Sequence, residues 1–407
     1  MKVNSVKGTN DYSPQEARCR DYINNVILNC YTAQGFNRIY TPILEDIENL
    51  EHSDGGDNLA LIFKVLKRGE KLDRAMESGD DLCDMGLRYD LTLPLCRFYA
   101  GHKNMLPSVF KVIQIDRVYR AERPQKGRNR EFVQCDIDIL GSSSPECEIE
   151  LIDTTASALL ALGMNNFSIA ISDRSLLKKV LEWCGFDKES YDSVCISFDK
   201  LDKIGKENVL NELLNKGLSS APVEKFGELL DKMPKTLDDL VSIIGEVEEM
   251  NSLRQIISSV EMVAGGKYGI HFDLSLVRGQ GYYTGTIYEI RSAEYGTSLG
   301  GGGRYDHLVG KLCGEEVPAV GFSIGFERIY DLLKDKIDFS LDKKKIAILY
   351  EDGEFLDAMM LSKNLKENYN ILLQPKANKL GKQLARLEAE GVDGYRFVAS
   401  DIKLFER

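Results

Sequence analysis

Two strand patterns joined by a strongly basic loop constrain the fold of this chain more than any other feature. Residues 109–119 read as a strand, with Val109, Lys111, Ile113 and Ile115 on one face and Arg117 continuing it, and residues 130–140 read as a second strand. The loop between them, residues 120–130, is short enough to connect two antiparallel neighbours. The segment therefore predicts a long hairpin and, with it, a fold that contains antiparallel sheet.

The loop of this hairpin concentrates positive charge on a chain whose net charge is −12. Its basic residues, counted from the end of the first strand, are Arg117, Arg120, Arg123, Lys126, Arg128 and Arg130. Guanidinium groups bind phosphate oxygens through paired donors in a fixed fork, so such a loop suits a polyphosphate. Glu122, in their midst, can accept a hydrogen bond from an amino group such as that of adenine. A solvated basic loop, or one that touches RNA phosphates, is the alternative.

The second strand of the hairpin carries three polar residues on one face, Gln134, Asp136 and Asp138. Such groups are costly to bury unless a ligand or a partner satisfies them, so this face is a candidate binding surface, with an exposed strand face as the alternative. Residues 87–92 predict another strand, on which Asp90 and Thr92 share a face that can hold an ammonium group. An ordinary polar strand end explains that second pattern equally well.

Three glycine-containing segments follow in the second half of the chain. Arg278 lies between an apolar pair and glycines that precede Tyr282 and Tyr283, and glycines admit backbone shapes that other residues resist. Residues 300–303 are four glycines, which match neither a Walker loop nor a dinucleotide fingerprint but allow close approach to a flat ligand. Arg328 lies in the first turns of a predicted helix, where the dipole also favours anions. The alternatives are a glycine-rich turn with core tyrosines at the first segment, a flexible turn at the second and a structural ion pair at Arg328.

The pattern of elements predicts one interrupted catalytic domain and two additions. Residues 1–166 and 266–335 form its two parts, residues 167–265 a mainly helical insertion, and residues 345–407 a small α/β unit. The acidic segment 73–84 is expected to be a solvated loop. The 43% hydrophobic content is ordinary for a globular protein, and the chain lacks an apolar run long enough to cross a membrane. We therefore expect a cytoplasmic protein. Its nine cysteines form no C-x-x-C pair, so we expect neither a disulfide framework nor a structural zinc site.

The order of these motifs resembles the three motifs of class II aminoacyl-tRNA synthetases. A strand that closes on Pro42 comes first, the Arg120-x-Glu122 loop second, and a glycine-flanked strand that runs into a helix with Arg328 third. Three further segments look like the histidyl-tRNA synthetase family within that class: residues 123–128, 278–283 and 301–306. The resemblance covers nearly the whole chain.

This resemblance implies an α+β fold, in which helices flank an antiparallel sheet, and a homodimer that binds ATP with Mg²⁺, L-histidine and the histidine tRNA. The implied catalytic residues are Arg120 and Arg278. The implied histidine site comprises Asp90, Leu91, Thr92, Arg120, Gln134, Asp138, Arg278, Tyr282 and Tyr283. The implied ATP site comprises Arg120, Glu122, Arg128 and Arg328. The implied reaction is attack of the histidine carboxylate on the α-phosphorus, followed by transfer of the histidyl group to tRNA.

Two departures from the family pattern stand out. The chain has Gln280 and Gly281 where the family commonly has Leu-Asp, and its C-terminal unit ends before the further strand and helix of the usual anticodon-binding domain. Two other functions are therefore considered. One is the regulatory subunit of ATP phosphoribosyltransferase, a non-catalytic paralogue that senses histidine and need not keep the arginines. The other is a ligase that joins an amino acid to a substrate other than tRNA.

Overall fold

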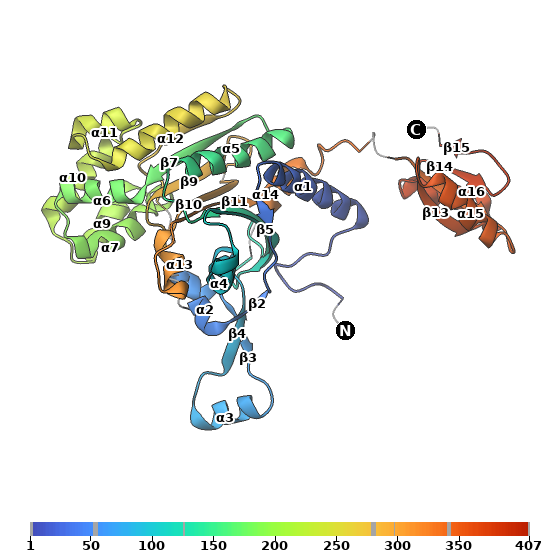
Figure 1. Ribbon diagram of the computed structural model, residues 1–407, viewed down its shortest axis with the longest axis horizontal. Coiled ribbons are helices and arrows are strands. Elements are labelled where there is room, and N and C mark those ends of the chain that lie inside the picture. The colour runs from blue at the N-terminus through green and yellow to red at the C-terminus, as the bar shows by residue number, and fades with distance from the viewer. Residues whose placement is uncertain are drawn as a thin grey trace. The chain divides into compact units, whose positions relative to one another are not determined.

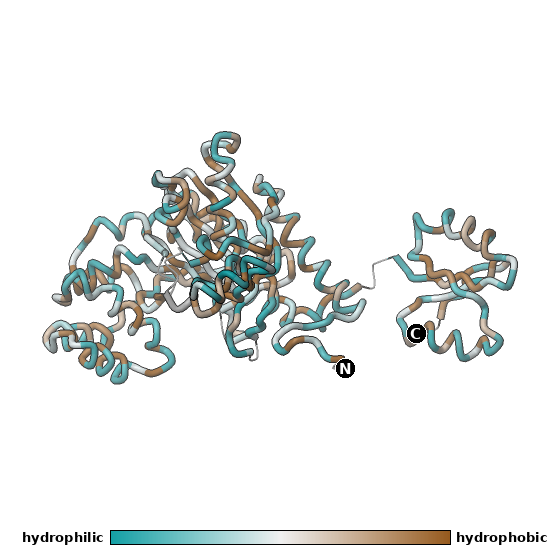
Figure 2. The backbone as a smooth tube through the Cα atoms, turned by 90° about the horizontal axis from the view of Figure 1, so that it is seen from below, coloured by the Kyte–Doolittle hydropathy of each residue, from teal (hydrophilic) through white to brown (hydrophobic). Residues whose placement is uncertain are grey.

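The computed structural model describes residues 3–51, 56–124, 127–277, 282–296, 298–339 and 343–405. The chain divides into two compact units, Met1–Asp335 and Lys336–Arg407, and each is described by itself. In the first unit, helices pack around one large sheet (Figure 1). Hydrophilic and hydrophobic residues alternate along its outer helices (Figure 2), as expected of helices that bury one face.

An eight-stranded sheet forms the centre of the first unit. Its strands, in order across the sheet, are β1 (Asn37–Arg38), β5 (Phe110–Tyr119), β6 (Glu131–Leu140), β11 (Ala319–Gly325), β10 (Gly300–Arg304), β9 (Thr286–Ser292), β7 (Phe167–Asp173) and β8 (Gly269–Phe272). The neighbouring strands are antiparallel except at the two edges, where β1–β5 and β7–β8 are parallel. The expected antiparallel sheet flanked by helices is confirmed, with this addition at its edges.

The predicted hairpin is also confirmed. β5 and β6 pair over their full length, from Phe110 opposite Leu140 to Tyr119 opposite Glu131. The basic loop therefore lies at one end of the longest strand pair in the sheet, where the two strands hold both of its ends.

Helix α1 (Pro14–Ala33) shows how the sequence sets a helix against this sheet. Ser13 and Glu16 form a capping box at its start, in which each side chain accepts a hydrogen bond from the other residue's backbone N–H. Its buried residues recur every four positions, at Cys19, Ile23, Ile27 and Tyr31. They pack the helix against β5 and against α5 (Glu146–Ala161).

A buried ion pair ties α5 to the sheet. The Arg304 guanidinium at the end of β10 binds Glu148 of α5 through two N–O contacts of 2.7 Å, from Nε and Nη2. Its other contacts are to Asp306 and to the carbonyl oxygens of Ser142 and Ser144, so all five N–H donors of the guanidinium have acceptors. Glu148 is 2% exposed and also accepts from the Thr286 hydroxyl at 2.9 Å. This cluster is saturated with hydrogen bonds.

Four further helices belong to the first unit: α2 (Ile47–Glu51), α4 (Thr92–His102), α13 (Asp306–Cys313) and α14 (Phe326–Leu333). Helix α14 packs on β6 and α1. α4 packs on α13, and buried residues such as Leu95, Val112 and Val309 join them to the sheet.

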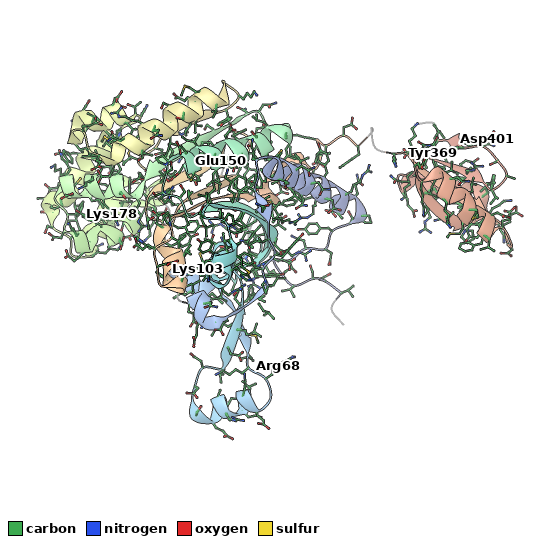
Figure 3. All side chains as sticks on the ribbon, in the orientation of Figure 1. Arg68, Lys103, Glu150, Lys178, Tyr369 and Asp401 are labelled. Atoms are coloured by element: carbon green, nitrogen blue, oxygen red, sulfur yellow. The ribbon has the colours of Figure 1, made fainter. Side chains whose placement is uncertain are left out.

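A three-stranded arm projects from the first unit (Figure 1). It consists of β2 (Leu44–Asp46), β4 (Cys83–Leu87) and β3 (Phe63–Leu66), with α3 (Glu70–Ser78) at its tip and Arg68 beside it (Figure 3). Two predictions are wrong here. The segment 73–84, expected as a loop, contains most of α3, and the strand expected at 87–92 ends at Leu87, so that Asp90 and Thr92 share no strand face.

The helical part of the first unit begins at Arg174 rather than at Phe167, because residues 167–173 form β7 of the central sheet. Its helices are α6 (Arg174–Cys184), α7 (Tyr191–Phe198), α8 (Leu201–Ile204), α9 (Lys206–Asn215), α10 (Ser220–Asp231), α11 (Leu237–Ile244) and α12 (Glu249–Ala264). Helix α12 packs back onto β7, β8 and α5. A 3-10 turn at Lys188–Ser190 joins α6 to α7, and further 3-10 turns lie outside this part at Gly56–Leu61 and Lys103–Met105.

The second unit has the expected alternation of strands and helices. Its sheet has the order β13 (Asn370–Pro375), β12 (Lys345–Tyr350), β14 (Gly394–Phe397) and β15 (Lys403–Leu404), with helices α15 (Phe355–Leu365) and α16 (Leu380–Ala389). Ala347, Leu349, Leu387 and Val392 form its buried core. In the ranges that the structure describes, no helix of either unit is long and apolar enough to cross a membrane.

Candidate active site

A cavity of about 380 Å³ lies where β6, β10 and β11 meet the hairpin loop and the start of α4. Ten of the residues expected in the site line it: Asp90, Thr92, Arg120, Glu122, Arg128, Gln134, Asp138, Tyr282, Tyr283 and Arg328. They come from segments more than 200 residues apart in the chain. The fold thus gathers the separate sequence motifs into one pocket.

Arg120 leaves the end of β5 and lines the cavity with its guanidinium partly anchored. Its Nε donates to the Tyr89 carbonyl at 3.0 Å, and the group lies over the Phe132 ring, 5.0 Å from the centroid. Among the described residues, its two terminal nitrogens have no hydrogen-bond partner. Arg120 therefore presents a paired donor edge of fixed orientation, the geometry that a carboxylate or a phosphate accepts.

The rest of the hairpin loop is braced by the N-terminal segment. Glu122 accepts from Arg128 at 3.3 Å, and its carbonyl accepts from Nε of Arg130 at 3.2 Å. The Arg130 backbone N–H donates to the Gly8 carbonyl at 2.7 Å. Gly8 has a φ of 90° and would place a Cβ 2.7 Å from Pro124, so only glycine fits this contact. No sequence pattern indicated this contact between Gly8 and the hairpin loop.

The polar face expected on β6 is confirmed, because Gln134, Asp136 and Asp138 all line the cavity. Asp136 and Asp138 are 4% and 3% exposed. Burial raises the pKa of Asp138 to about 7, against a lowering by the hydrogen bond from Tyr305. Burial also raises the pKa of Asp136 well above its ordinary value, and the neighbouring Asp138 raises it further. This end of the cavity is an acidic recess with little water.

Asp138 is held in place by a tyrosine and a glycine. The Tyr305 hydroxyl donates to Asp138 Oδ1 at 2.7 Å, whereas the buried Oδ2 has no partner among the described residues. Gly321 lies opposite Asp138 across the β6–β11 pair, and a Cβ there would come within 1.9 Å of Oδ1. The glycine therefore makes the room that the carboxylate occupies, and the free oxygen is an acceptor for a ligand.

Asp90 reaches the cavity from the turn before α4. Its Oδ1 accepts from the Leu93 backbone N–H at 3.2 Å, a helix-start contact that replaces the strand geometry expected from the sequence. Burial raises its pKa, while that hydrogen bond and Arg120 lower it. Leu91 contributes differently from its neighbours: it is fully buried, and its carbonyl accepts from the Gln114 amide at 2.8 Å.

Aromatic rings and a glycine strand form the other walls. Tyr282 lies 4.8 Å from Tyr283 and 6.2 Å from Tyr305 between ring centroids, so the three rings make one cluster. The four glycines form the strand β10 rather than a turn, and they line the cavity. At Gly302 a Cβ would lie 2.0 Å from the Gly321 carbonyl oxygen, so the strand needs glycine for close packing on β11.

The start of α14 brings two charged residues to the cavity. Glu327 receives both terminal nitrogens of Arg20 in α1, at 2.6 and 2.8 Å, and its Oε1 also accepts from the Val133 backbone N–H at 3.3 Å. The Arg328 guanidinium donates to the Ser298 carbonyl. Arg328 is therefore anchored between α14 and the turn before β10.

Arg278, together with Gln280 and Gly281, lies outside the described residues. Polar lining residues that were absent from the expected site include Asn129, Asp136, Tyr305, Ser323 and Glu327. Asp136 had been placed on the polar face of β6, and Asn129 lies in the predicted hairpin loop. The other three reach the cavity through strand pairing and helix packing of distant segments.

Comparison with known proteins agrees with this geometry. A family model described as histidyl-tRNA synthetase matches residues 8–329. A histidine--tRNA ligase of Leifsonia xyli subsp. xyli is 41% identical over 98% of this chain and 96% of its own length. A crystal structure of histidyl-tRNA synthetase from Nostoc sp. PCC 7120 superposes with a TM-score of 0.79 at 27% identity, over 97% of this chain and 91% of that one.

A further solved structure shares the fold alone. It is described as an ATP phosphoribosyltransferase regulatory subunit/histidyl-tRNA synthetase from Bacillus halodurans C, with a TM-score of 0.78 but 19% identity, over 98% of this chain and 97% of that one. The family model and the similarity to the Leifsonia protein both extend over most of the sequence. The chain belongs to the histidyl-tRNA synthetase family.

Proposed function

We propose that this enzyme is a histidine--tRNA ligase, which activates histidine with ATP and transfers the histidyl group to the histidine tRNA. The observation that carries the proposal is the polarity of a single cavity. Arginines of the hairpin loop and of α14 line one part of it, and the acidic recess of β6 lines another. A phosphate-rich substrate and a cationic one can therefore meet within one pocket.

The ATP part rests on Arg120, Glu122, Arg128 and Arg328. The anchored guanidiniums supply paired donors for phosphate oxygens, and Glu122 supplies an acceptor for the adenine amino group. The flat backbone of β10 lets a ring approach closely, because its glycines carry no side chains.

The histidine part rests on the recess formed by Asp90, Gln134 and Asp138, with Thr92 beside it and Tyr282 and Tyr283 as its aromatic wall. Unpaired buried acceptors on β6 suit the N–H groups of an α-ammonium and an imidazole. Leu91 supports this part by holding the turn before α4 through its carbonyl contact with Gln114.

In the proposed reaction the histidine carboxylate attacks the α-phosphorus of ATP and pyrophosphate leaves. Arg120 orients the carboxylate and stabilises the charge that grows on the phosphoryl oxygens. By the family resemblance Arg278 is the second catalytic cation. Catalysis is then positioning and electrostatics, and it needs no protein nucleophile. The ribose hydroxyl of the tRNA takes the histidyl group in the second step.

Mg²⁺ would supply charge neutralisation between phosphate groups of the bound ATP. The described residues hold no group of three or more His, Cys, Asp or Glu side chains that could bind a metal. A magnesium ion that accompanies a nucleotide is usually held by phosphate oxygens with one or two carboxylates, and Glu327 is the carboxylate beside Arg328 in the lining of the cavity.

The proposal includes a homodimer. β1 is an edge strand of the central sheet, and the chain after it exposes three apolar residues close in sequence: Tyr40, Ile43 and Leu44, at 69%, 37% and 48%. An edge strand next to exposed apolar side chains is a common site of subunit pairing. Sedimentation analysis checks this part of the proposal.

The two other functions have weaker support. A non-catalytic regulatory subunit need not keep phosphate-binding arginines, yet Arg120, Arg128 and Arg328 meet in one cavity. A ligase for another acceptor would share the first step and differ only in the second. Charging of purified histidine tRNA separates it from the proposed enzyme.

The test is histidine-dependent exchange of pyrophosphate into ATP by the purified protein. We expect exchange with histidine and background levels without it. Arg120→Gln should lower the exchange rate by about 100-fold or more, as expected for loss of a group that stabilises transition-state charge. Arg117→Gln, at the exposed end of the same strand and outside the cavity, is the matched control and should retain the rate. Absence of histidine-dependent exchange contradicts the proposal.

A further inference from the structure

Gln134 makes contacts on β6 that fix which way its amide points. Its Nε2 donates to the Ser323 hydroxyl at 3.1 Å and lies 3.4 Å from each carboxylate oxygen of Asp136. Its carbonyl oxygen Oε1 is buried and has no partner within the described parts of the chain. All of the amide's donor capacity is therefore directed at Asp136 and Ser323, and its acceptor is left over.

The pairing of β6 with β11 explains why these residues meet. Ser323 lies directly opposite Asp136, with Gly325 opposite Gln134 and Gly321 opposite Asp138. The glycines leave space beside the two residues that carry unpaired acceptors. The serine, between the glycines, hydrogen-bonds the Asp136 carboxylate, a contact that lowers its pKa against the effect of burial. β11 thus makes room for Gln134 and Asp138 and ties down Asp136.

We propose that Asp136, supported by Ser323, is a positioning residue that turns the Gln134 amide so that its carbonyl oxygen faces the substrate. The recess then offers the Gln134 Oε1 and the Asp138 Oδ2 as two acceptors and no competing amide donor. It selects a ligand end with N–H donors, such as an ammonium or an imidazole. This inference rests on the proposed function, because it assigns the residue that prepares the histidine-binding face of the same cavity.

The amide orientation does not depend on the charge of Asp136. An ionised carboxylate accepts through both oxygens, and a protonated one still keeps a carbonyl oxygen that accepts. In either state the neighbouring Gln134 nitrogen is preferred over its oxygen at this contact. Replacement by asparagine keeps such an acceptor, whereas replacement by leucine keeps the approximate size and removes it.

The experiment measures the histidine dissociation constant of the full-length protein by calorimetry. Asp136→Leu should weaken binding about tenfold, the effect of losing one well-placed hydrogen bond, and Asp136→Asn should stay within about threefold of the unaltered protein. The KM for ATP in the exchange reaction should not change in either variant. Ser323→Ala should weaken histidine binding by about threefold.

A double-mutant cycle tests whether Asp136 acts through Gln134. In a Gln134→Ala background, Asp136→Leu should produce no further loss of histidine affinity. If Asp136→Leu lowers the affinity for histidine tenfold both in the unaltered protein and in the Gln134→Ala protein, the inference is overturned. It is also overturned if the Asp136→Leu protein binds histidine normally. If the exchange reaction works and the cycle is additive, only this inference fails. If the unaltered protein neither binds histidine nor supports exchange, the proposed function fails with it.

Cys135→Ala is the control for damage to the strand. Cys135 is the neighbour of Asp136 on β6, is fully buried and does not line the cavity. This variant should lower the thermal midpoint without changing the histidine dissociation constant. A loss of affinity in Cys135→Ala that equals the loss in Asp136→Leu would assign the effect to strand packing and overturn the positioning role.

Discussion

Two buried polar regions of the same sheet differ in how completely their hydrogen bonds are made. Around Arg304 and Glu148, every guanidinium donor has an acceptor, and the carboxylate is held through both oxygens. On β6, the Gln134 Oε1 and the Asp138 Oδ2 are buried acceptor atoms with no partner among the described residues. Burial of polar groups is common to both regions, so burial alone does not distinguish the cavity wall from the Arg304 cluster. The unused acceptors of the cavity wall do, because a buried polar atom is costly until something binds it.

The largest effect should come from breaking the saturated region. Glu148→Ala leaves Arg304 buried without its main partner, which should cost about 3–5 kcal/mol of unfolding free energy. Urea unfolding followed by circular dichroism measures this. The control is Glu150→Ala on the same helix α5 (Figure 3), whose ion pair with Lys111 is partly exposed and should contribute about 0–1 kcal/mol. Equal losses in the two variants would remove the distinction between the regions.

The second prediction alters the unsaturated region without removing a polar group. Gly321→Ala should displace the Asp138 carboxylate, because its Cβ would lie 1.9 Å from Oδ1. We expect histidine binding to weaken about tenfold or more, the value of a hydrogen bond to a charged group. Calorimetry measures the change. Gly101→Ala, where a Cβ meets nothing within 4 Å, should leave the affinity as it was.

The third prediction concerns the pH dependence of the free energy of unfolding. Burial raises the pKa of Asp138 from its ordinary 3.8 to about 7, so the folded protein holds this proton more tightly than the unfolded chain. The resulting stabilisation is complete below about pH 4 and is lost as the pH rises through 7. Asp138→Asn should remove this contribution, up to about 1.4 kcal/mol per pH unit. Urea unfolding between pH 5 and 8 measures the slope, and identical slopes would contradict the assignment.

Sequence patterns predicted those elements that depend only on residues close together in the chain. The hairpin of β5 and β6 was predicted from its two strand patterns. The shared face of Gln134 and Asp138 was predicted because side chains two residues apart on a strand point the same way. The helix α3 was missed because its apolar residues are few, Leu72, Ala75 and Met76, and stand among charged ones; of these, only Ala75 is buried. Asp90 was assigned to a strand because capping of α4 and an alternating strand end look alike in five residues.

The remaining site residues depend on contacts that no local pattern carries. Arg20 and Glu327 are 307 positions apart, and they meet only because α1 packs beside α14. Tyr305 reaches Asp138 across the sheet over 167 positions. The Gly8 carbonyl accepts a hydrogen bond from the Arg130 backbone N–H, although no sequence pattern links the two residues. Such pairs are set by sheet order and helix packing, which composition and periodicity leave open.

The glycine strand β10 has a consequence for how substrate choice can change. A wall made of backbone offers few positions where a side chain can be exchanged, because at Gly302 any added carbon would meet the Gly321 carbonyl. Variation in the amino acid that is accepted is therefore expected on β6, which β11 separates from β10, or on the tyrosine wall. Substitutions on β6 or among the tyrosines can therefore change which ligand the cavity binds, whereas almost any substitution on β10 would disrupt the packing of the sheet.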